Sequence, residues 1–363
     1  MHPLSLNKLD GCIVILIIPY CCMLMKTRNK VLFALPVVLS ILSCSKTENT
    51  NPSNEQEQEK QQAAAATDYR QEMRNFVIGI SQYAKAQNPQ FAIIPQNGIE
   101  LITTNGESDG TLAQTYLNAI DGVGQEDLFF GYEDDNKPTP SEDNLYLREF
   151  LNRIKTTKKV MVTDYCSGKT NMDKSYSSNN TNGYISFAAD KRELYNIPAY
   201  PAQPYGVNTN NITSLSQAKN FLYLINPEKF SSKKQFIDSV KTKNYDVILM
   251  DLFLNETAFT AAEIDQLKTK ANGGKRLVIC YMSIGEAEDY RYYWQSTWKV
   301  GNPPFIVAEN PDWPGNYKVR YWNTDWKNVI FGNDASYTKK LINSHFDGAY
   351  LDIIDGFEYF EGN

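Results

Sequence analysis

The sequence predicts an α/β fold, a circularly permuted (β/α)8 TIM barrel preceded by a signal segment and a flexible linker. Along residues 68–363, short apolar segments alternate with helical patterns, which is typical of parallel strands covered by helices. A strand pattern over Phe346–Phe357 follows the last helical pattern, whereas a helical pattern from Asp68 precedes the first strand. These two segments can complete one βα unit, so we expect them to meet in a closed ring.

An open, doubly wound parallel sheet is the alternative fold. Such a sheet would carry a glycine-rich phosphate-binding turn after one of its strands. Neither a GxGxxG nor a Walker sequence occurs in the chain. The barrel therefore remains the better interpretation.

The first half of the folded region begins with a helix at Asp68, whose side chain can cap the N–H of Gln71. One face of this helix is apolar at helical spacing and contains Met73, Phe76, Val77, Ile80 and Ala84. The elements expected next are a strand over Phe91–Gly98, a helix near Leu112–Asn118, a strand near Gly122–Phe130, a helix over Leu145–Ile154, and strands over Val160–Tyr165 and Gly183–Ala188.

The second half repeats this alternation. A capping box, Thr260 with Glu263, marks one helix start, and Gly273 with Gly274 is expected to end that helix. The expected elements are strands over Phe221–Asn226, Tyr245–Asp251 and Arg276–Ser283, helices over Lys233–Lys241 and Ser336–Ser344, an aromatic excursion over 290–326, and the final strand.

The N-terminal residues predict a lipoprotein signal sequence. Residues 1–22 are interpreted as an extension upstream of the natural start, and residues 23–43 as a signal peptide with a basic segment and a short apolar one. Ile41–Cys44 resembles a lipobox, so Cys44 is the expected lipid-bearing residue, anchoring the protein to a membrane of the cell envelope. A membrane helix in this region is the alternative.

Residues 44–67 are polar and of low complexity, which predicts a flexible tether. Beyond this tether the chain has two cysteines, Cys166 and Cys280, both in or beside strand-like segments. They are expected to be buried thiols, with a disulfide between them as the open alternative.

Composition excludes several classes of function. A net charge of −6 argues against a nucleic-acid partner, which requires clustered Lys and Arg. The chain has only two histidines, His2 and His345, so a Ser-His-Asp triad or a catalytic zinc site is disfavoured. The chemistry is therefore expected to depend on carboxylates and tyrosines.

Polar side chains recur where the predicted strands end, and these ends carry the active site of a (β/α)8 barrel. Taken singly, each of these side chains could be a helix cap or a solvated loop group. The acids and amides at these positions are Gln96, Asn97, Glu126, Asp164, Asp251, Glu286, Asp352 and Asp355, and the tyrosines that could orient sugar hydroxyls are Tyr165, Tyr223 and Tyr281. Five tryptophans in the excursion could form a sugar-stacking wall or a small core of their own.

Several segments resemble the endo-alpha-1,4-polygalactosaminidase family of glycoside hydrolases, formerly described as related to cysteinyl-tRNA synthetase. The resemblance is carried by Cys280–Arg291, by Glu309–Val319 and by Phe346–Phe360. Ile94–Gly98 and Asp121–Asp127 resemble later segments of that family, so the order is swapped, as expected for a circular permutation.

This resemblance implies a retaining glycosidase that acts on a galactosamine- or galactose-containing polysaccharide. It implies that Asp352 is the nucleophile and Glu126 the acid/base, with Asp251, Gln96, Asn97 and Asp355 as candidate binding residues. Tyr281, Glu286, Asp164 and Tyr223 complete the candidate substrate-binding set. The partners expected are the polysaccharide and, through Cys44, a membrane; we expect a monomer without cofactor or metal.

Two other functions remain open. One is a lipoprotein that binds glycans without cleaving them. The other is a Mg²⁺- or Ca²⁺-dependent hydrolase with oxygen ligands from Asp251, Glu286, Asp352 and Asp355.

Overall fold

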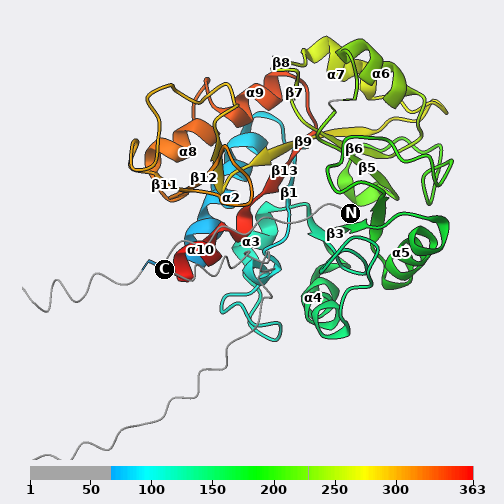
Figure 1. Ribbon diagram of the computed structural model, residues 1–363, viewed down its shortest axis with the longest axis horizontal. Helices are drawn as coiled ribbons and strands as arrows, with labels where there is room; N and C mark the ends of the chain where they lie inside the picture. The colour runs from blue at the N-terminus through cyan, green and yellow to red at the C-terminus, as the bar shows by residue number, and fades with distance from the viewer. Residues whose placement is uncertain (1–66, 228, 363) are drawn as a thin grey trace, which may run out of the picture. The chain divides into compact units, whose positions relative to one another are not determined.

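The computed structural model of the protein describes residues 67–227 and 229–362 (Figure 1). The predicted upstream extension (1–22), signal peptide (23–43), lipidated Cys44 and nearly all of the tether (44–67) lie outside the described residues. Among the described helices, none has both the length and the apolar character needed to cross a bilayer.

The centre of the fold is made of parallel strands at the eight places where the sequence predicted them. Five of them form one sheet in the order β1 (Ala92–Pro95), β13 (Gly348–Asp352), β9 (Leu277–Ser283), β6 (Val247–Met250) and β5 (Phe221–Leu224). Three more form a second sheet in the order β2 (Gly122–Glu126), β3 (Lys159–Tyr165) and β4 (Ile185–Ala189). All neighbouring pairs in these two sheets are parallel. The mixed α/β architecture with a central parallel sheet is thus confirmed.

The first and last of these strands lie side by side. β1 pairs with β13 in a register that runs from Ala92 opposite Gly348 to Pro95 opposite Leu351. The ring of Tyr69 also lies 5.4 Å from that of Phe360, so the two ends of the described region are in contact. The predicted pairing of these distant segments is confirmed.

The two sheets continue into each other on one side of β1. Gln96 and Gly124 form a parallel bridge, and the N–H of Asn97 donates to the carbonyl of Gly124 at 2.9 Å. On the far side, the ring of Phe187 on β4 lies 6.0 Å from that of Phe221 on β5. β1 therefore lies between β13 and β2.

A side-chain contact shows how strongly the five-stranded sheet curves. The hydroxyl of Tyr223 on β5 donates to the side-chain carbonyl of Gln96, just after β1, at 2.8 Å. In a flat sheet these edge strands would be about 19 Å apart, because neighbouring strands are spaced by ~4.8 Å. The sheet must therefore bend around an interior that Tyr223 crosses.

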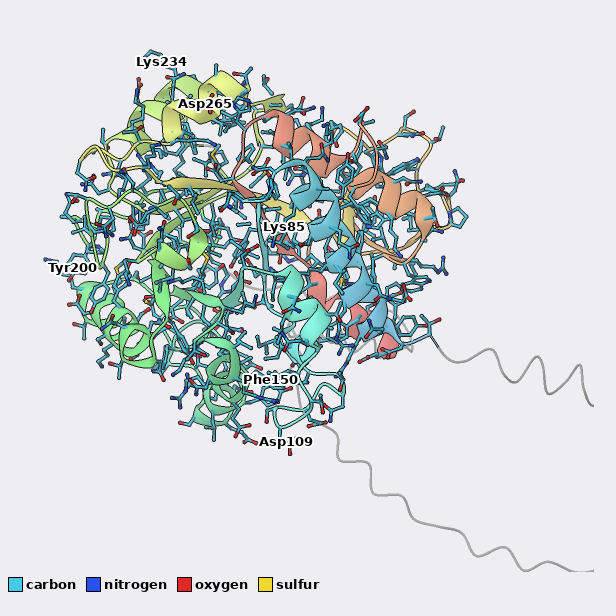
Figure 2. All side chains as sticks on the ribbon, turned by 180° about the vertical axis from the view of Figure 1, so that it is seen from behind. Lys85, Asp109, Phe150, Tyr200, Lys234 and Asp265 are labelled. Carbon is cyan, nitrogen blue, oxygen red and sulfur yellow. The ribbon has the colours of Figure 1, made fainter. Side chains whose placement is uncertain are left out.

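Helices lie around these strands, and Figure 2 shows α2 in front of them, with Lys85 near the centre of the view. The helix α2 packs against α3 and α9, and its predicted apolar face from Met73 to Ala84 is fully buried. The helices are α2 (Tyr69–Gln87), α3 (Gln114–Ala119), α4 (Ser141–Ile154), α5 (Lys169–Asn182), α6 (Lys233–Lys241), α7 (Ala261–Leu267), α8 (Thr324–Ile330), α9 (Tyr337–Asn343) and α10 (Phe357–Glu361). Short 3-10 turns are η1 (Ile99–Ile102), η2 (Leu215–Gln217) and η3 (Ile354–Gly356).

The structure differs from the sequence prediction at four helices. The helix α8, at the end of the predicted excursion, was not predicted, and the segment predicted as a strand over Phe346–Phe357 is a strand only to Asp352, after which η3 and the unpredicted α10 follow. The helix α5 was not predicted, because two of its four buried residues, Ser175 and Asn179, are polar and interrupt the apolar period. The helix α7 starts at the predicted capping box but ends at Leu267, before the predicted glycine stop. The residues that follow fold back instead, with Thr269 bridged to Lys275.

Two strands of the aromatic excursion form a small antiparallel sheet with the strand just before it, in the order β10 (Glu286–Glu288), β12 (Asn316–Val319) and β11 (Ile306–Glu309). A short hairpin, β7 (Phe253–Leu254) with β8 (Thr257–Ala258), follows β6. Trp326 is fully buried, Trp294, Trp298 and Trp322 are partly buried against the core, and only Trp313, 63% exposed, is open to solvent among these five. Four of the five therefore pack in or against the main hydrophobic core instead of forming a small core of their own.

Cys166 and Cys280 are both free and buried, as the thiol interpretation predicted.

Candidate active site

Two carboxylates mark the rim where the strands end. Glu126 is the last residue of β2 and Asp352 the last residue of β13, and β1 lies between these strands. Their backbones are thus two strand spacings apart, about 9.6 Å. The two carboxyl groups can lie closer together than this, because their side chains can reach toward each other. Residues more than two hundred positions apart in the sequence share one rim.

Donors from two other strands orient the carboxylate of Glu126. Its Oε2 accepts from Gln96 Nε2 at 2.7 Å and from Asn97 Nδ2 at 3.0 Å, and its Oε1 accepts from the hydroxyl of Tyr165 at the end of β3. Asn97 Oδ1 also accepts from the backbone N–H of Glu126 at 3.0 Å. Both oxygens of the carboxylate therefore have fixed directions.

The backbone at the ends of β1 and β2 makes this arrangement possible. Asn97 has a φ of 61°, a left-handed conformation that Asn tolerates better than most residues. Gly124, two residues before Glu126 on the same strand face, leaves room for the ring of Tyr350, because a Cβ at this position would collide with the Tyr350 hydroxyl. A side chain at position 124 would displace the floor of the site.

Tyrosines form that floor. The hydrogen bond from Tyr223 to the carbonyl oxygen of Gln96 leaves the Gln96 amide nitrogen directed at Glu126. The ring of Tyr350 meets that of Tyr223 edge-on at 5.3 Å. The hydroxyl of Tyr350 is buried and has no hydrogen-bond partner among the described residues.

Asp352 has a different environment. Its Oδ2 accepts from the hydroxyl of Tyr281 on β9 at 2.7 Å. Burial and the negative charge of Glu126 raise the pKa of Asp352 to about 8, while the hydrogen bond from Tyr281 opposes this rise. Near neutral pH, Asp352 therefore holds a proton.

Asp355 lies in η3, three residues after Asp352, and is partly exposed. Its negative charge adds to the rise in the pKa of Asp352, so it belongs to the same rim.

Asp251 follows β6 and forms an ion pair. Arg291 Nη1 lies 2.7 Å from Asp251 Oδ2, and Arg291 Nε lies 2.6 Å from Glu288 Oε2. Burial raises the pKa of Asp251, and the charge of Arg291 opposes the rise. All three side chains are nearly inaccessible, at 10% exposure or less. This group lies beside Tyr281, whose pKa rises with burial and with the charges of Asp352 and Glu288.

Glu286 is also paired with a cation. It is 2% exposed and accepts from Asn310 at 2.9 Å and from Lys318 at 3.2 Å. These contacts join β10 to β12 and to the turn before it, so Glu286 holds the small sheet together.

Asp164 lies apart from the other candidates. Its carboxylate is fully buried and accepts from the N–H groups of Phe129 and Phe130 and from the side chains of Ser175 and Asn179. Neighbouring side chains alternate across a strand, and because Tyr165 contacts Glu126, Asp164 points the other way, toward α5. The structure therefore does not bring Asp164 to the site, and we withdraw its predicted substrate contact.

The geometry also bears on the metal-dependent alternative. Among residues 67–227 and 229–362, no three or more Asp, Glu, His or Cys side chains are grouped so that they could hold a metal ion. Asp251 and Glu286 face Arg291 and Lys318 rather than Asp352 and Asp355. The four predicted ligands do not converge.

Two arginines near the site escaped the sequence analysis. Arg291 was inside a segment used for the resemblance, but only acids, amides and tyrosines were considered. Arg192, described below, lies in the connection after β4, where no periodic pattern indicates a position. Arg192 follows the predicted strand end Ala188 by four residues and Arg291 follows Ser283 by eight, so a search for cations just after the predicted strand ends would have found Arg192 before Arg291.

Comparison with protein families finds one match. Residues 202–363 match the model of glycoside-hydrolase family GH114. This segment includes Asp352, Asp251 and Tyr281, whereas Glu126, Gln96 and Asn97 precede it.

Three curated relatives are similar over parts of their length, and all three are uncharacterized. A protein of Methanocaldococcus jannaschii is 38% identical over 159 residues, 43% of each chain. A protein of Thermotoga maritima is 34% identical over 120 residues, 33% of this chain and 36% of the relative. A protein of Deinococcus radiodurans is 37% identical over 123 residues, 34% of this chain and 37% of the relative. The chain thus matches less than half the length of each relative.

Proposed function

We propose that the protein is a glycoside hydrolase that cleaves a polysaccharide by a retaining mechanism, with Glu126 and Asp352 as its two catalytic carboxyls. The observation that carries this proposal is the pair itself, two carboxyls from strands on either side of β1, of which Asp352 has its pKa raised to about 8. A pair of carboxyls at one site suffices for glycoside hydrolysis. The match of residues 202–363 to a glycoside-hydrolase family supports the same reaction class.

In the proposed reaction, Asp352 attacks the anomeric carbon while Glu126 protonates the departing glycosidic oxygen. Glu126 then removes a proton from the water that releases the sugar from Asp352. Attack requires Asp352 to be ionised and Glu126 to carry a proton. Moving a proton from Asp352 to Glu126 leaves the net charge of the pair unchanged, so a sugar oxygen that accepts a hydrogen bond from Glu126 can favour this arrangement. A retaining pair is expected to be about 5–5.5 Å apart.

The proposed substrate is a galactosamine- or galactose-containing polysaccharide, as the resemblance implies. Gln96, Asn97, Tyr223 and Tyr281 support catalysis by orienting the two carboxyls. Binding of substrate by Asp251, Glu286 and Asp355 is part of the proposal.

We further propose that residues 68–363 form a closed and circularly permuted barrel. Closure between β4 and β5 is supported by the Phe187–Phe221 contact and by the N–H of Ile225, which donates to the carbonyl of Leu194 at 3.1 Å. Permutation is supported by the position of α2 between α9 and α3, where a helix joining β13 to β1 would lie. Lipidation at Cys44, an envelope location and a monomeric state complete the proposal.

A polysaccharide screen tests the reaction. Wild-type protein and Glu126→Gln are incubated with amino-sugar and galactose polymers, and new reducing ends are measured. We expect release by the wild type and a loss of roughly 10²–10⁴-fold in the variant. Glu263→Gln, which alters the carboxylate of the α7 capping box and none of the proposed site residues, is the matched control.

The anomer formed first, followed by NMR, decides the stereochemistry. Retention supports the two-step reaction, and inversion contradicts it. Tight binding of a polymer that the wild type never cleaves would instead support a glycan-binding protein.

A further inference from the structure

Arg192 lies in the long connection between β4 and β5 and has no part in the reaction proposed above. Its side chain is 40% exposed, yet its guanidinium makes four directed contacts. It lies over the ring of Tyr165, 3.9 Å from the ring centroid, and forms ion pairs with Asp127 at 3.0 Å and Asp135 at 2.7 Å. It also donates to the carbonyl of Gly131 at 2.8 Å.

Two of these contacts reach the immediate neighbours of Glu126. Asp127 follows Glu126 in the chain and has a left-handed φ of 57°, a conformation that Asp adopts less readily than Gly. Tyr165 donates its hydroxyl to the carboxylate of Glu126. One guanidinium therefore holds both the residue after Glu126 and the hydroxyl that orients it.

The charges around Arg192 point to a local, geometric role. Asp127 and Asp135 face the guanidinium and together outweigh its single positive charge. Burial raises the pKa of Asp127 to about 7, and the hydrogen bond from Arg192 opposes this rise. The charged groups beyond Tyr165 are Glu126 and, across the site, Asp352.

From these contacts we infer that Arg192 is a positioning residue that acts on Glu126 through Tyr165. This inference rests on the proposed function only for its effect on turnover, since the geometry it describes exists without substrate. A planar guanidinium can stack on a ring and pair with two carboxylates at once. A lysine ammonium cannot reproduce all of these contacts, so Arg192→Lys is a meaningful conservative change.

The chain offers a matched control for loss of such an arginine. Arg70 also pairs with a carboxylate, Glu361, at 2.9 Å and lies 5.0 Å over an aromatic ring, that of Phe357. It joins α2 to α10 and contacts neither Glu126 nor Tyr165. Arg70→Ala reports what the loss of a surface arginine does to the fold alone.

The first measurement is turnover as a function of pH. Arg192→Ala is expected to lower kcat roughly 10–10²-fold, because a small displacement of a catalytic group has effects of this size. We expect it to shift the pH profile as well, whereas Arg70→Ala leaves both kcat and the profile unchanged. Arg192→Lys is expected to recover only part of the loss. An unchanged profile in Arg192→Ala, or an equal shift in Arg70→Ala, overturns the inference.

A double-mutant cycle tests the route through Tyr165. Tyr165→Phe keeps the ring but removes the hydroxyl that Glu126 accepts from. If Arg192 acts through this hydroxyl, Arg192→Ala has little further effect in the Tyr165→Phe background. A full, multiplicative effect in that background contradicts the inference.

A readout without substrate separates this inference from the proposed function. The carboxyl ¹³C shift of Asp352 is followed against pH and assigned by its loss in Asp352→Asn. The negative charge of Glu126 helps to raise the pKa of Asp352, so a Glu126 carboxylate displaced by the loss of Arg192 is expected to shift the titration of Asp352 in Arg192→Ala. A wild type that cleaves no glycan rejects the proposed function, while an unmoved Asp352 titration rejects the role of Arg192.

Discussion

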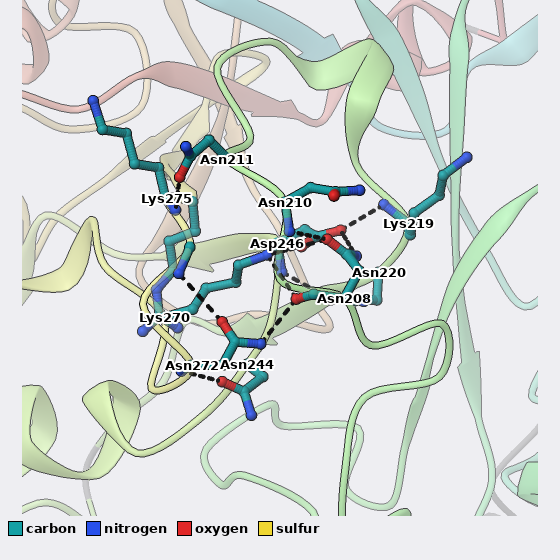
Figure 3. Close-up of polar contacts among 12 residues, drawn as sticks. Asn208, Asn210, Asn211, Lys219, Asn220, Asn244, Asp246, Lys270, Asn272 and Lys275 are labelled. Carbon is teal, nitrogen blue, oxygen red and sulfur yellow. Dashed lines mark hydrogen bonds and ion pairs between the residues drawn. The ribbon is translucent and has the colours of Figure 1, made fainter.

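Two aspartates lie at opposite ends of the central parallel strands and differ in what surrounds them. Asp246 comes immediately before β6, and Asp352 is the last residue of β13. Figure 3 shows the polar cluster around Asp246, which gathers Lys270 and several asparagines from neighbouring loops. In a (β/α)8 barrel the first of these ends serves stability and the second serves catalysis.

Asp246 has a full set of partners. Lys270 lies 2.8 Å from its Oδ1, and both side chains are completely buried. Its Oδ2 accepts from Asn208 Nδ2 and from the N–H of Lys219, each at 2.9 Å. With these contacts the buried carboxylate ties β6 to the loops before β5 and β9.

Asp352, in contrast, has negatively charged groups beside it as well as a hydrogen-bond donor. It accepts a hydrogen bond from Tyr281, while Glu126 and Asp355 bring negative charge close to it. Its raised pKa follows from burial first and from these charges second. The comparison teaches that the completeness of the donor set, rather than burial alone, separates a structural carboxylate from a proton-holding one.

The largest expected effect is on catalysis. Asp352→Asn should reduce hydrolysis by roughly 10²–10⁴-fold while the protein stays folded, because the proposed nucleophile is lost. Reducing-end release and thermal unfolding are measured on the same samples. Asp246→Asn, changed in the same chemical way, should keep its turnover per folded molecule. Equal losses in both variants would break the comparison.

The next effect is on stability. Lys270→Met leaves the charge of Asp246 buried without its cation, which should lower the free energy of unfolding by about 3–5 kcal/mol. Denaturant unfolding measures this loss. Lys234→Met is the control, since Lys234 pairs with Asp238 but is 84% exposed, and its loss should cost less than about 1 kcal/mol. A comparable loss in both variants would contradict a special role for the buried pair.

Tyr281→Phe tests the single donor that Asp352 receives from β9. The hydrogen bond from Tyr281 lowers the pKa of Asp352, so its loss should raise that pKa further above 8. A hydrogen bond to a charged group contributes about 1.5–3 kcal/mol, so kcat/KM at neutral pH should fall roughly tenfold or more. The pH profile of kcat/KM measures this effect. Its rising limb should move to higher pH, and a shift to lower pH would contradict the assignment.

The effect that is smallest per pH unit is the pH dependence of stability. Asp352 has a folded pKa of about 8, whereas an unfolded Asp titrates near ~3.9. Between these values the folded state holds a proton that the unfolded state has lost, so Asp352 destabilises the fold progressively as pH rises from about 4 to 8. The slope from this group is at most about 1.4 kcal/mol per pH unit.

Denaturant unfolding of wild type and Asp352→Asn across this range isolates that slope. Asp127, with a pKa of about 7, makes the same contribution to the pH dependence of stability in both proteins, so this contribution cancels in the difference. The difference should grow with pH and level off above pH 8. A difference that is constant with pH would show that Asp352 is not protonated in the folded state.

The alternation of strands and helices could be predicted from the sequence because each element buries its own apolar face. The spacing from Met73 to Ala84 and the apolar strand around Ile248 needed no distant partner to be recognised. The helix α5 could not be predicted in this way, because it lacks a continuous apolar face of its own. Its polar residues Ser175 and Asn179 are buried against Asp164 on β3.

Chain order and local chemistry also placed Gln96, Asn97, Glu126 and Asp352 at strand ends, and placed the first strand beside the last. These inferences hold because the ends of parallel strands meet at one rim whatever surrounds them. This reasoning did not determine the direction in which each side chain points. Asp164 and Tyr165 are adjacent in the sequence, yet Asp164 faces α5 and Tyr165 faces Glu126.

Only the tertiary structure decided which of these polar groups have a full set of hydrogen-bond donors and opposite charges around them. Three contacts join segments that local sequence patterns do not relate. They are the ion pair of Asp251 with Arg291, the stacking of Arg192 on Tyr165, and the buried ion pair of Asp246 with Lys270. Hydrogen bonds and charges act over a few ångströms in space, and a sequence records only distance along the chain. A carboxylate's protonation is therefore set by neighbours that only folding brings within reach.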